Sequence, residues 1–352
     1  MGSAKNRLFV LVSVCVALCT TDRSSAAGLA PQFAESACNT LLPASAGGSM
    51  PRDKHLMVLR WLGWSTYEVA YDGKIILLDA FIDIDSRNVG LNTADVHHAD
   101  AILIGHPHFD HILNAPQLSA QTGASIFVAP AGRKYLEQQG VRPERIKYVR
   151  GGEKIEMAGF TVQTALAIHS TIDPSLTKKS TEFLSAADPM SESERRTFMD
   201  NLKATTLADP NVPEEDIVHQ GTIAYLITFA DGTRVSFRDS PAVPTEAERD
   251  LIETVTDKGK RIDVGIVGYQ GPAVRLAIKD ATLPLARAYH PRLLLPAHED
   301  RAGDGYSDMA VAPLVVAMRA ELPDVSMAEP VYRSPICFNI SSGSVFNNIN
   351  AR

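Results

Sequence analysis

The chain has 352 residues, 45% of them hydrophobic and 21% charged, with a formal net charge of −7 at pH 7. This length and composition suffice for a large buried core, in one domain or two, and exclude a chain that is mostly disordered. The acidic balance argues against a nucleic-acid partner, because binding to a phosphate backbone usually needs a basic face.

The first 27 residues have the three-part layout of a secretory signal peptide. Lys5 and Arg7 precede an apolar stretch at residues 8–19, and Ser-Ala-Ala follows at 25–27. The apolar stretch is too short to cross a bilayer comfortably, so a membrane anchor is the weaker alternative. We predict cleavage after residue 27, a periplasmic or secreted location, and no stable membrane insertion of the mature chain. Removal of residues 1–27 would leave 31 basic and 40 acidic residues, a net charge of −9.

Four cysteines are present, and two of them, Cys15 and Cys19, would leave with the signal peptide. Cys38 and Cys337 remain, one near each end of the mature chain. They are either a disulfide or two separate buried thiols. Because two remain in a chain that we expect to be exported, we predict that they form a disulfide.

Residues 28–56 contain Pro, Gly, Ser and Ala with little periodicity, and we expect an N-terminal arm ahead of one domain at 57–352. From Met57 onward, short apolar strands alternate with helical segments, and Asp72-Gly73 is typical of a hairpin turn. Three predicted strands end one or two positions before an Asp or a His: 75–78 before Asp79, 101–104 before His106, and 160–167 before His169. The predicted helices in this part are 115–121 and 132–139.

Residues 170–219 interrupt the alternation. They are polar, and one helix is predicted in them, at 191–203, with Ser191 as N-cap and Glu194 completing a capping box. Long connections of this kind are usually functional, so we expect a partly helical insertion that acts as a lid or contacts substrate. A decorative surface insertion is the alternative.

The strand pattern resumes after the insertion. Strands at 222–229 and 234–237, joined by Asp231-Gly232, lead to Asp239, in the order already seen from Tyr67 to Asp79. This similarity hints at two related halves. The remaining predicted elements are helices 245–256 and 280–289 and strands 263–267 and 292–295, the last shortly before His298. Strands mixed with helices throughout predict an α/β sandwich with sheets inside and helices outside.

The run His106-Pro107-His108-Phe109-Asp110-His111 holds four potential metal ligands within six residues. In an extended segment, His106 and His108 point the same way, and imidazole is a good ligand for zinc and similar ions. Asp110 and His111 follow at what resembles the start of a helix, close to the first pair but aimed differently. Packed or capping residues do not account for this spacing, so we predict a metal site.

One such run cannot complete two metal shells, so further ligands must come from elsewhere. His169, Asp239 and His298 each lie just beyond the carboxyl end of a predicted apolar strand. Functional loops of α/β folds gather at these strand ends. We therefore expect all three residues to join the same site.

The pattern His-x-His-x-Asp-His, then a later His, a later Asp and a final His, resembles the metallo-β-lactamase superfamily. The opening Trp61-Leu62-Gly63-Trp64-Ser65-Thr66, with Asp72-Gly73 and Asp79, resembles in particular the ascorbate-6-phosphate lactonase-like branch. The likeness covers roughly residues 57–300. It implies a four-layer αββα sandwich with the site along one edge, where the two halves meet.

The resemblance also implies a set of ligands for two divalent ions. The first ion would be held by His106, His108 and His169, and the second by Asp110, His111 and His298, with Asp239 bridging them. Zinc is the expected metal, with manganese or iron as alternatives. Asp79 corresponds to a residue that supports the site without binding metal.

Contacts with a small-molecule substrate are expected from three further residues. The branch often carries His after the glycine that corresponds to Gly63, but Trp64 stands here, which suggests an apolar pocket wall. Tyr269 follows a predicted strand and should lie at the same edge. His219 ends the insertion, where an exposed loop histidine is an equally good interpretation.

The implied reaction is hydrolysis of an ester, lactone, amide or phosphodiester bond by a metal-bound hydroxide, since two adjacent ions lower the pKa of a shared water. Asp110 or Asp239 would pass the proton to the leaving group. No Gly-x-Ser-x-Gly elbow is present in the chain. The alternatives are a mononuclear iron oxidoreductase of the persulfide dioxygenase type and a non-catalytic metal-binding protein. Retention of every ligand position favours the dinuclear hydrolase.

Overall fold

The computed structural model describes residues 35–82, 91–170, 221–256, 259–269, 278, 281–298 and 311–347, all within one compact unit, Glu35–Arg352. The predicted signal peptide and the predicted insertion, with its helix at 191–203 and His219, lie outside the described residues apart from Ser170. No helix in the described part of the chain is both long and apolar enough to span a membrane.

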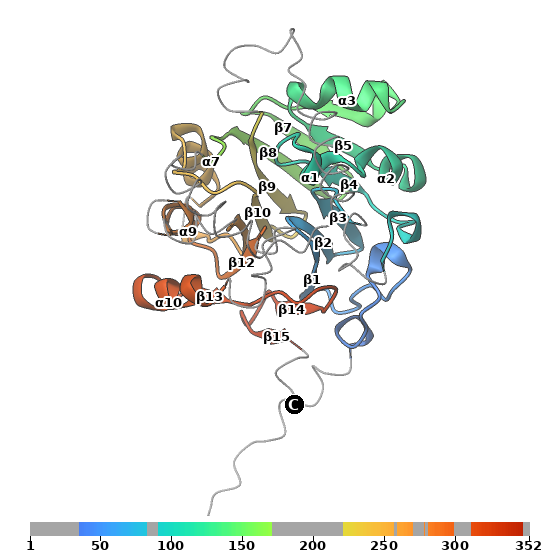
Figure 1. Ribbon diagram of the computed structural model, residues 1–352. Helices are drawn as coiled ribbons and strands as arrows, with labels where there is room; N and C mark the ends of the chain where they lie inside the picture. The colour runs from blue at the N-terminus through green and yellow to red at the C-terminus, as the bar shows by residue number, and fades with distance from the viewer. Residues whose placement is uncertain are drawn as a thin grey trace, which may run out of the picture. The chain divides into compact units, whose positions relative to one another are not determined.

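Two β-sheets form the centre of this unit (Figure 1). The strands of the first sheet, in spatial order, are β15 (Val345–Asn347), β14 (Ile336–Asn339), β1 (Leu56–Gly63), β2 (Thr66–Tyr71), β3 (Lys74–Leu78), β4 (Ala101–Leu103), β5 (Ser125–Val128) and β6 (Ile146–Tyr148). Pairing is antiparallel from β15 to β3 and parallel from β3 to β6. The parallel part brings the carboxyl ends of β3 and β4 to one edge.

The second sheet repeats this arrangement. Its strands, in spatial order, are β7 (Lys154–Met157), β8 (Phe160–Leu166), β9 (Ile223–Phe229), β10 (Arg234–Arg238), β11 (Val264–Gly268), β12 (Leu293–Ala297) and β13 (Ser326–Met327). The hairpin β9–β10 is antiparallel and β10 to β13 are parallel. The blocks β2–β3–β4 and β9–β10–β11 therefore share one topology, as the sequence similarity between them suggested.

Side-chain alternation along the strands sorts the core into layers. Leu103 and Phe127 point into the core between the two sheets, while their neighbours Ile102 and Ile126 point the other way. Helices α2 (Ala115–Thr122) and α3 (Arg133–Gln138) cover the outer face of the first sheet. Helices α7 (Glu246–Thr256), α9 (Thr282–Tyr289) and α10 (Ala312–Glu321) cover that of the second.

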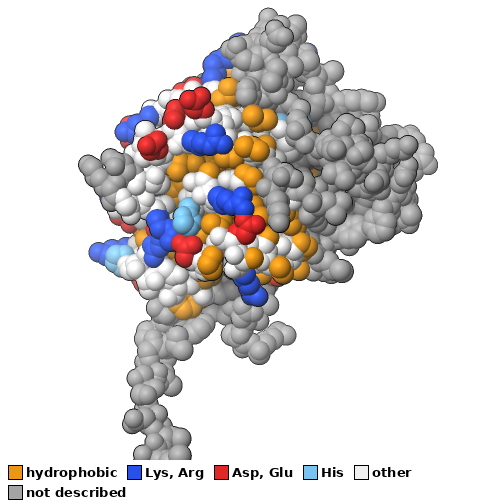
Figure 2. All heavy atoms as spheres, turned by 90° about the vertical axis from the view of Figure 1, so that its left-hand side faces the viewer, with side chains coloured by type: hydrophobic (Ala, Val, Ile, Leu, Met, Phe, Trp, Pro, Cys, Tyr) orange, Lys and Arg blue, Asp and Glu red, His pale blue; other side chains and the backbone are white. Residues whose placement is uncertain are grey.

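The result is the predicted four-layer αββα sandwich of an α/β protein (Figure 1). Figure 2 views the side of α7, α9 and α10, where charged side chains of both signs lie among apolar ones. Such mixing of charges is ordinary for the solvent side of an outer helical layer.

Two buried tyrosines join the sheets by hydrogen bonds. The Tyr67 hydroxyl on β2 donates to the Pro296 carbonyl on β12, at 2.6 Å. The Tyr225 hydroxyl on β9 lies 2.8 Å from the Ile104 carbonyl, directly after β4. Each acceptor stands two residues before a predicted metal ligand, His298 or His106. These bonds therefore hold the strand ends that carry the ligands at fixed depth in the sandwich.

Residues 35–50 pack on the first sheet through a buried ion pair. Arg60 and Glu68 are wholly buried, with Nη1 and Oε1 3.1 Å apart. Glu68 accepts the backbone N–H groups of Ala44 and Ser45, and Arg60 donates to the Ala37 carbonyl. The N-terminal segment thus supplies hydrogen-bond partners to both charges. These partners replace part of the water that the charges lose on burial.

Cys38 and Cys337 are joined by a disulfide, with their Cα atoms 6.0 Å apart. The bond links the N-terminal segment to β14 across 299 positions of sequence. A cross-link over so long a span removes much conformational freedom from the unfolded chain.

We expect the double variant Cys38→Ser/Cys337→Ser to lose about 2–5 kcal/mol of unfolding free energy, because its unfolded state is no longer constrained. Urea unfolding of oxidised wild type against the variant measures the loss. Reductant should bring the wild-type midpoint to that of the variant and leave the variant unchanged. Equal midpoints for oxidised wild type and variant would contradict the expectation.

Candidate metal centre

The loop after β4 supplies four of the seven predicted ligands. His106 follows the buried end of β4, and His108 has extended backbone and precedes α1 (Phe109–Ile112), a single helical turn that carries Asp110 and His111. His106 and His111 are buried, whereas His108 and Asp110 are half-buried. The loop therefore carries two buried donor side chains and two that are partly accessible to solvent.

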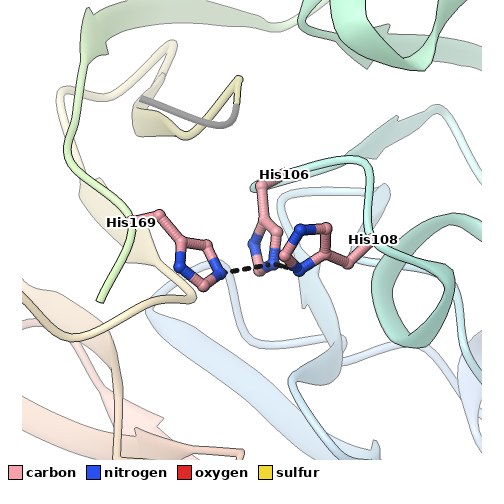
Figure 3. Close-up of side chains that lie close together, drawn as sticks. All are labelled: His106, His108 and His169. Atoms are coloured by element: carbon pink, nitrogen blue, oxygen red, sulfur yellow. Dashed lines mark hydrogen bonds between the residues drawn. The ribbon is translucent and has the colours of Figure 1, made fainter. Parts of the chain in front are cut away.

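His106, His108 and His169 converge on one point (Figure 3). The Nε2 atom of His106 lies 3.0 Å from Nδ1 of His108 and 3.2 Å from Nε2 of His169. A tetrahedral ion with Zn–N bonds of about 2.0–2.1 Å would separate its ligand atoms by about 3.3–3.4 Å. The donor set and its spacing thus fit a single divalent ion.

Asp110, His111 and His298 form a second group beside the first. Nε2 of His298 lies 3.1 Å from Oδ2 of Asp110, and Nε2 of His111 lies 3.7 Å from Oδ1 of the same carboxylate. His298 is the residue directly after β12 and has a left-handed backbone conformation, with φ of 65°. This group contains one carboxylate and two imidazoles, which also suits a divalent ion.

Asp239, directly after β10, lies between the two groups and is fully buried. Its Oδ2 atom is 2.5 Å from Nδ1 of His106 and 3.2 Å from Nδ1 of His111. The carboxylate thus contacts one ring from each group, on the Nδ1 side. The bridging role that the resemblance implies stays a prediction.

Asp79 supports the loop after β4 through polar contacts. Its Oδ1 accepts the backbone N–H of Gly105 at 2.8 Å, and its Oδ2 lies 2.7 Å from Nδ1 of His111 and accepts the hydroxyl of Ser65 at 2.5 Å. Ser65 was not singled out from the sequence. Its place in the Trp61–Thr66 stretch was the only available signal, since its contact with Asp79 spans 14 residues.

Asp79 and His111 form a buried pair in which each changes the pKa of the other. Burial raises the pKa of Asp79 to about 7. Burial alone lowers the pKa of His111, but the charges of Asp110, Asp79 and Asp239 outweigh it and raise that pKa to about 10. In the metal-free protein at neutral pH, the surrounding carboxylates therefore favour the protonated form of His111.

In the group His106/His108/His169, the pKa values of His106 and His169 are lowered and not raised. Burial and the neighbouring imidazoles of His111 and His108 lower the pKa of His106 well below its ordinary value. Burial and His108 lower the pKa of His169 to about 4. These two rings are therefore neutral at pH 7, the form in which imidazole binds metal.

Trp64, predicted as a pocket wall, is only 2% exposed. Its ring lies 5.1 Å from that of His298 and 5.1 Å from that of Phe81, both edge to face. Its carbonyl accepts the backbone N–H of His298 at 2.8 Å. In the structure Trp64 therefore packs against a candidate ligand.

Of the other two predicted substrate contacts, the structure describes Tyr269. Tyr269 is fully buried in the core between the second sheet and its helices, beside residues such as Leu283 and Ile252. Its side chain therefore lies on the helix side of the sheet. His219 lies outside the described residues.

Comparison with known families finds a match over residues 74–199 to the model of the beta-lactamase superfamily domain. Among curated proteins, a "UPF0173 metal-dependent hydrolase" of Methylocella silvestris is 33% identical over 115 residues, which cover 33% of this chain and 49% of that protein. A protein of the same description from Methanopyrus kandleri is 30% identical, covering 33% and 48%. The chain thus spans about half the length of the curated relatives that it matches.

Among solved structures, a metallo hydrolase from the archaeon Ignicoccus hospitalis aligns with 80% of this chain and 98% of its own, with a TM-score of 0.49 and 15% identity.

Gly105→Ala should disrupt the site, because a methyl group at this position would overlap the Asp239 carboxylate. Overpacking of this kind destabilises by about 1–3 kcal/mol, and the displaced carboxylate should weaken metal binding. Urea unfolding and zinc titration measure the two effects. Gly265→Ala on β11, where the added methyl group would lie nearest to the side chains of Pro291 and Ser236, is the control. Wild-type zinc affinity in Gly105→Ala would refute the placement of Asp239.

Zinc affinity should rise with pH between about 7 and 9, by up to about tenfold per unit. His111 has a raised pKa of about 10, so its proton competes with the metal and the competition fades as pH increases. Calorimetry in buffers of different ionisation enthalpy should detect release of this proton. A pH-independent affinity over this range, after correction for the buffer, would contradict the assignment.

The matched residues 74–199 include the whole run from His106 to His111 and also His169. Around them, two sheets and their helices form the sandwich that the resemblance implied, with the candidate ligands gathered at strand ends. Over residues 74–199, the chain is therefore similar to the beta-lactamase superfamily domain.

Proposed function

We propose that this protein is a hydrolase that binds two divalent metal ions and cleaves an ester, lactone, amide or phosphodiester bond of a small molecule. One observation carries the proposal. Two three-residue donor groups, His106/His108/His169 and Asp110/His111/His298, lie side by side with Asp239 between them. The curated relatives are described as metal-dependent hydrolases, which supports the same activity.

Bound ions would lower the pKa of a coordinated water and polarise the bond to be cleaved. Of the two carboxylates predicted to move a proton, Asp110 has 14% of its side chain exposed, whereas Asp239 has none. Burial alone would raise the pKa of Asp110, but the charge of His111 and the hydrogen bond from His298 bring it well below the ordinary value. Asp110 is therefore a carboxylate at neutral pH, accessible enough to accept a proton and pass it on.

Zinc is the proposed metal, because five imidazoles and two carboxylates form a donor set of the kind that zinc prefers. Manganese and iron remain to be compared. Membership of the lactonase-like branch stays a prediction. The proposed periplasmic or secreted location is supported by the signal-peptide layout at residues 1–27 and by the disulfide between Cys38 and Cys337, since disulfides persist in oxidising compartments.

The test combines metal counting with a substrate panel. Metal-stripped protein is loaded with zinc, manganese or iron, bound metal per chain is measured, and lactones, esters, β-lactams and phosphodiesters are offered. We expect two ions per chain in wild type, about one in His298→Ala, and a fall in turnover of at least about 100-fold in His108→Ala.

His290→Ala removes a histidine paired with Asp324 on the surface and is the matched control, expected to behave as wild type. One iron per chain with no hydrolysis of any substrate would favour the mononuclear oxidoreductase. Full activity in His108→Ala would show that the chemistry occurs elsewhere.

A further inference from the structure

Two arginines of the described chain are wholly buried, each beside a wholly buried glutamate at 3.1 Å: Arg60 with Glu68 and Arg238 with Glu248. Removing a guanidinium from water is strongly unfavourable unless its donors are paired. The contacts of Arg60 secure the N-terminal segment. Arg238 is the last residue of β10 and directly precedes Asp239, so its contacts concern the candidate metal centre.

The guanidinium of Arg238 connects helix α7 with the strand end that carries His169. Its Nε donates to Oε1 of Glu248, and its Nη2 donates to the carbonyl of Ile168, the residue before His169. Ile168 is distant from Arg238 in sequence by 70 positions. One rigid, planar group thus fixes where the backbone of this strand end lies.

Glu248 is itself held in place. Its Oε2 accepts the backbone N–H of Thr245 at 2.9 Å, and its Oε1 accepts the hydroxyl of Tyr289 on α9 at 2.9 Å. Thr245 also donates its hydroxyl to the carbonyl of Leu166, the last residue of β8. The support for Arg238 therefore comes from two outer helices and from the strand that leads to His169.

The third nitrogen of the guanidinium faces Asp239. Nη1 of Arg238 lies 3.9 Å from Oδ1 of Asp239. Both atoms are buried, and neither has a hydrogen-bond partner among the described residues. At this distance the two opposite charges attract each other, which favours this orientation of the carboxylate.

We propose that Arg238 is a positioning residue for the metal centre, which sets the placement of both His169, through the Ile168 carbonyl, and Asp239, through its carboxylate. This inference rests on the metal binding proposed above. It assigns to the network Tyr289–Glu248–Arg238 a role in metal affinity as well as in stability.

Loss of positioning and loss of charge change metal affinity in opposite directions, so the direction of the change distinguishes them. Arg238 places a positive charge close to a site for cations, so loss of that charge alone would tighten metal binding. Loss of positioning would weaken binding, by about 10- to 100-fold for groups that orient ligands. Arg238→Gln therefore decides between the two effects.

The experiment measures zinc affinity by competition with a chromophoric chelator, on metal-stripped full chain, alongside its thermal unfolding. Arg60→Gln is the matched control, because it breaks an equivalent buried pair away from the site. We expect both variants to unfold at lower temperature, but only Arg238→Gln to bind zinc about 10- to 100-fold more weakly. Arg238→Lys, with a cation but no planar fork, should recover part of the affinity.

A second pair of variants decides the matter if Arg238→Gln does not fold. Tyr289→Phe removes one hydrogen bond from Glu248 and leaves every charge in place, and we expect about 2- to 10-fold weaker zinc binding. Tyr71→Phe, which loses a buried hydroxyl contact with Asp231, should keep wild-type affinity.

Three results would overturn the inference: unchanged or tighter zinc binding in Arg238→Gln, equal weakening in Arg60→Gln, or unchanged binding in Tyr289→Phe. Failure of the wild-type protein to bind zinc, manganese or iron at all would instead overturn the proposed function, and the inference with it.

Discussion

The loop after β4, which supplies four of the candidate metal ligands, depends on the buried carboxylate of Asp79. Asp79 stands in a left-handed conformation with φ of 56° directly after β3, where the strand has ended and the side chain can turn beneath the neighbouring loop. From there it accepts a hydrogen bond from the backbone of Gly105, directly before the candidate ligand run, and contacts the ring of His111, the last residue of the run. Without this acceptor, the buried N–H of Gly105 would lose its hydrogen bond, which is strongly unfavourable, and Nδ1 of His111 would keep only Ser65 and Asp239 as neighbours.

The second sheet supports the other ligands by a similar arrangement. Asp239 follows β10 as Asp79 follows β3, but it faces the rings of His106 and His111 instead of a backbone N–H. Tyr67 and Tyr225 then tie each sheet to the opposite one near the ligand-bearing ends. The centre is thus built from two similar halves whose corresponding carboxylates have different partners, one supporting the loop and one entering the cluster.

Much of this centre could be predicted from the sequence, because metal donors are rare side-chain types and strand ends can be located from short apolar runs. His106 to His111 needed only local spacing, and the sandwich followed from the alternation of strands and helices. The supporting contacts could not be predicted in this way. Ser65, Arg238 and Glu248 are ordinary residues whose partners are fixed by strand pairing over long separations, such as the 70 positions between Arg238 and Ile168.

The direction of the Trp64 side chain could not be predicted from the sequence either. Its residue type suggested a pocket wall, but a tryptophan beside a site can face either the substrate or a ligand. The left-handed backbone of Trp64, with φ of 53°, turns its ring against His298. Only the three-dimensional path of the chain after β1 determines that direction.

The link between Cys38 and Cys337 makes nearly the whole sandwich a covalently closed ring. A single cut in the backbone at any point between the two cysteines, including within residues 171–220, would open this ring and release no fragment. Both pieces would stay attached through the sulfur atoms. A protease that cuts a connecting segment would therefore leave the strands that carry the candidate ligands covalently linked.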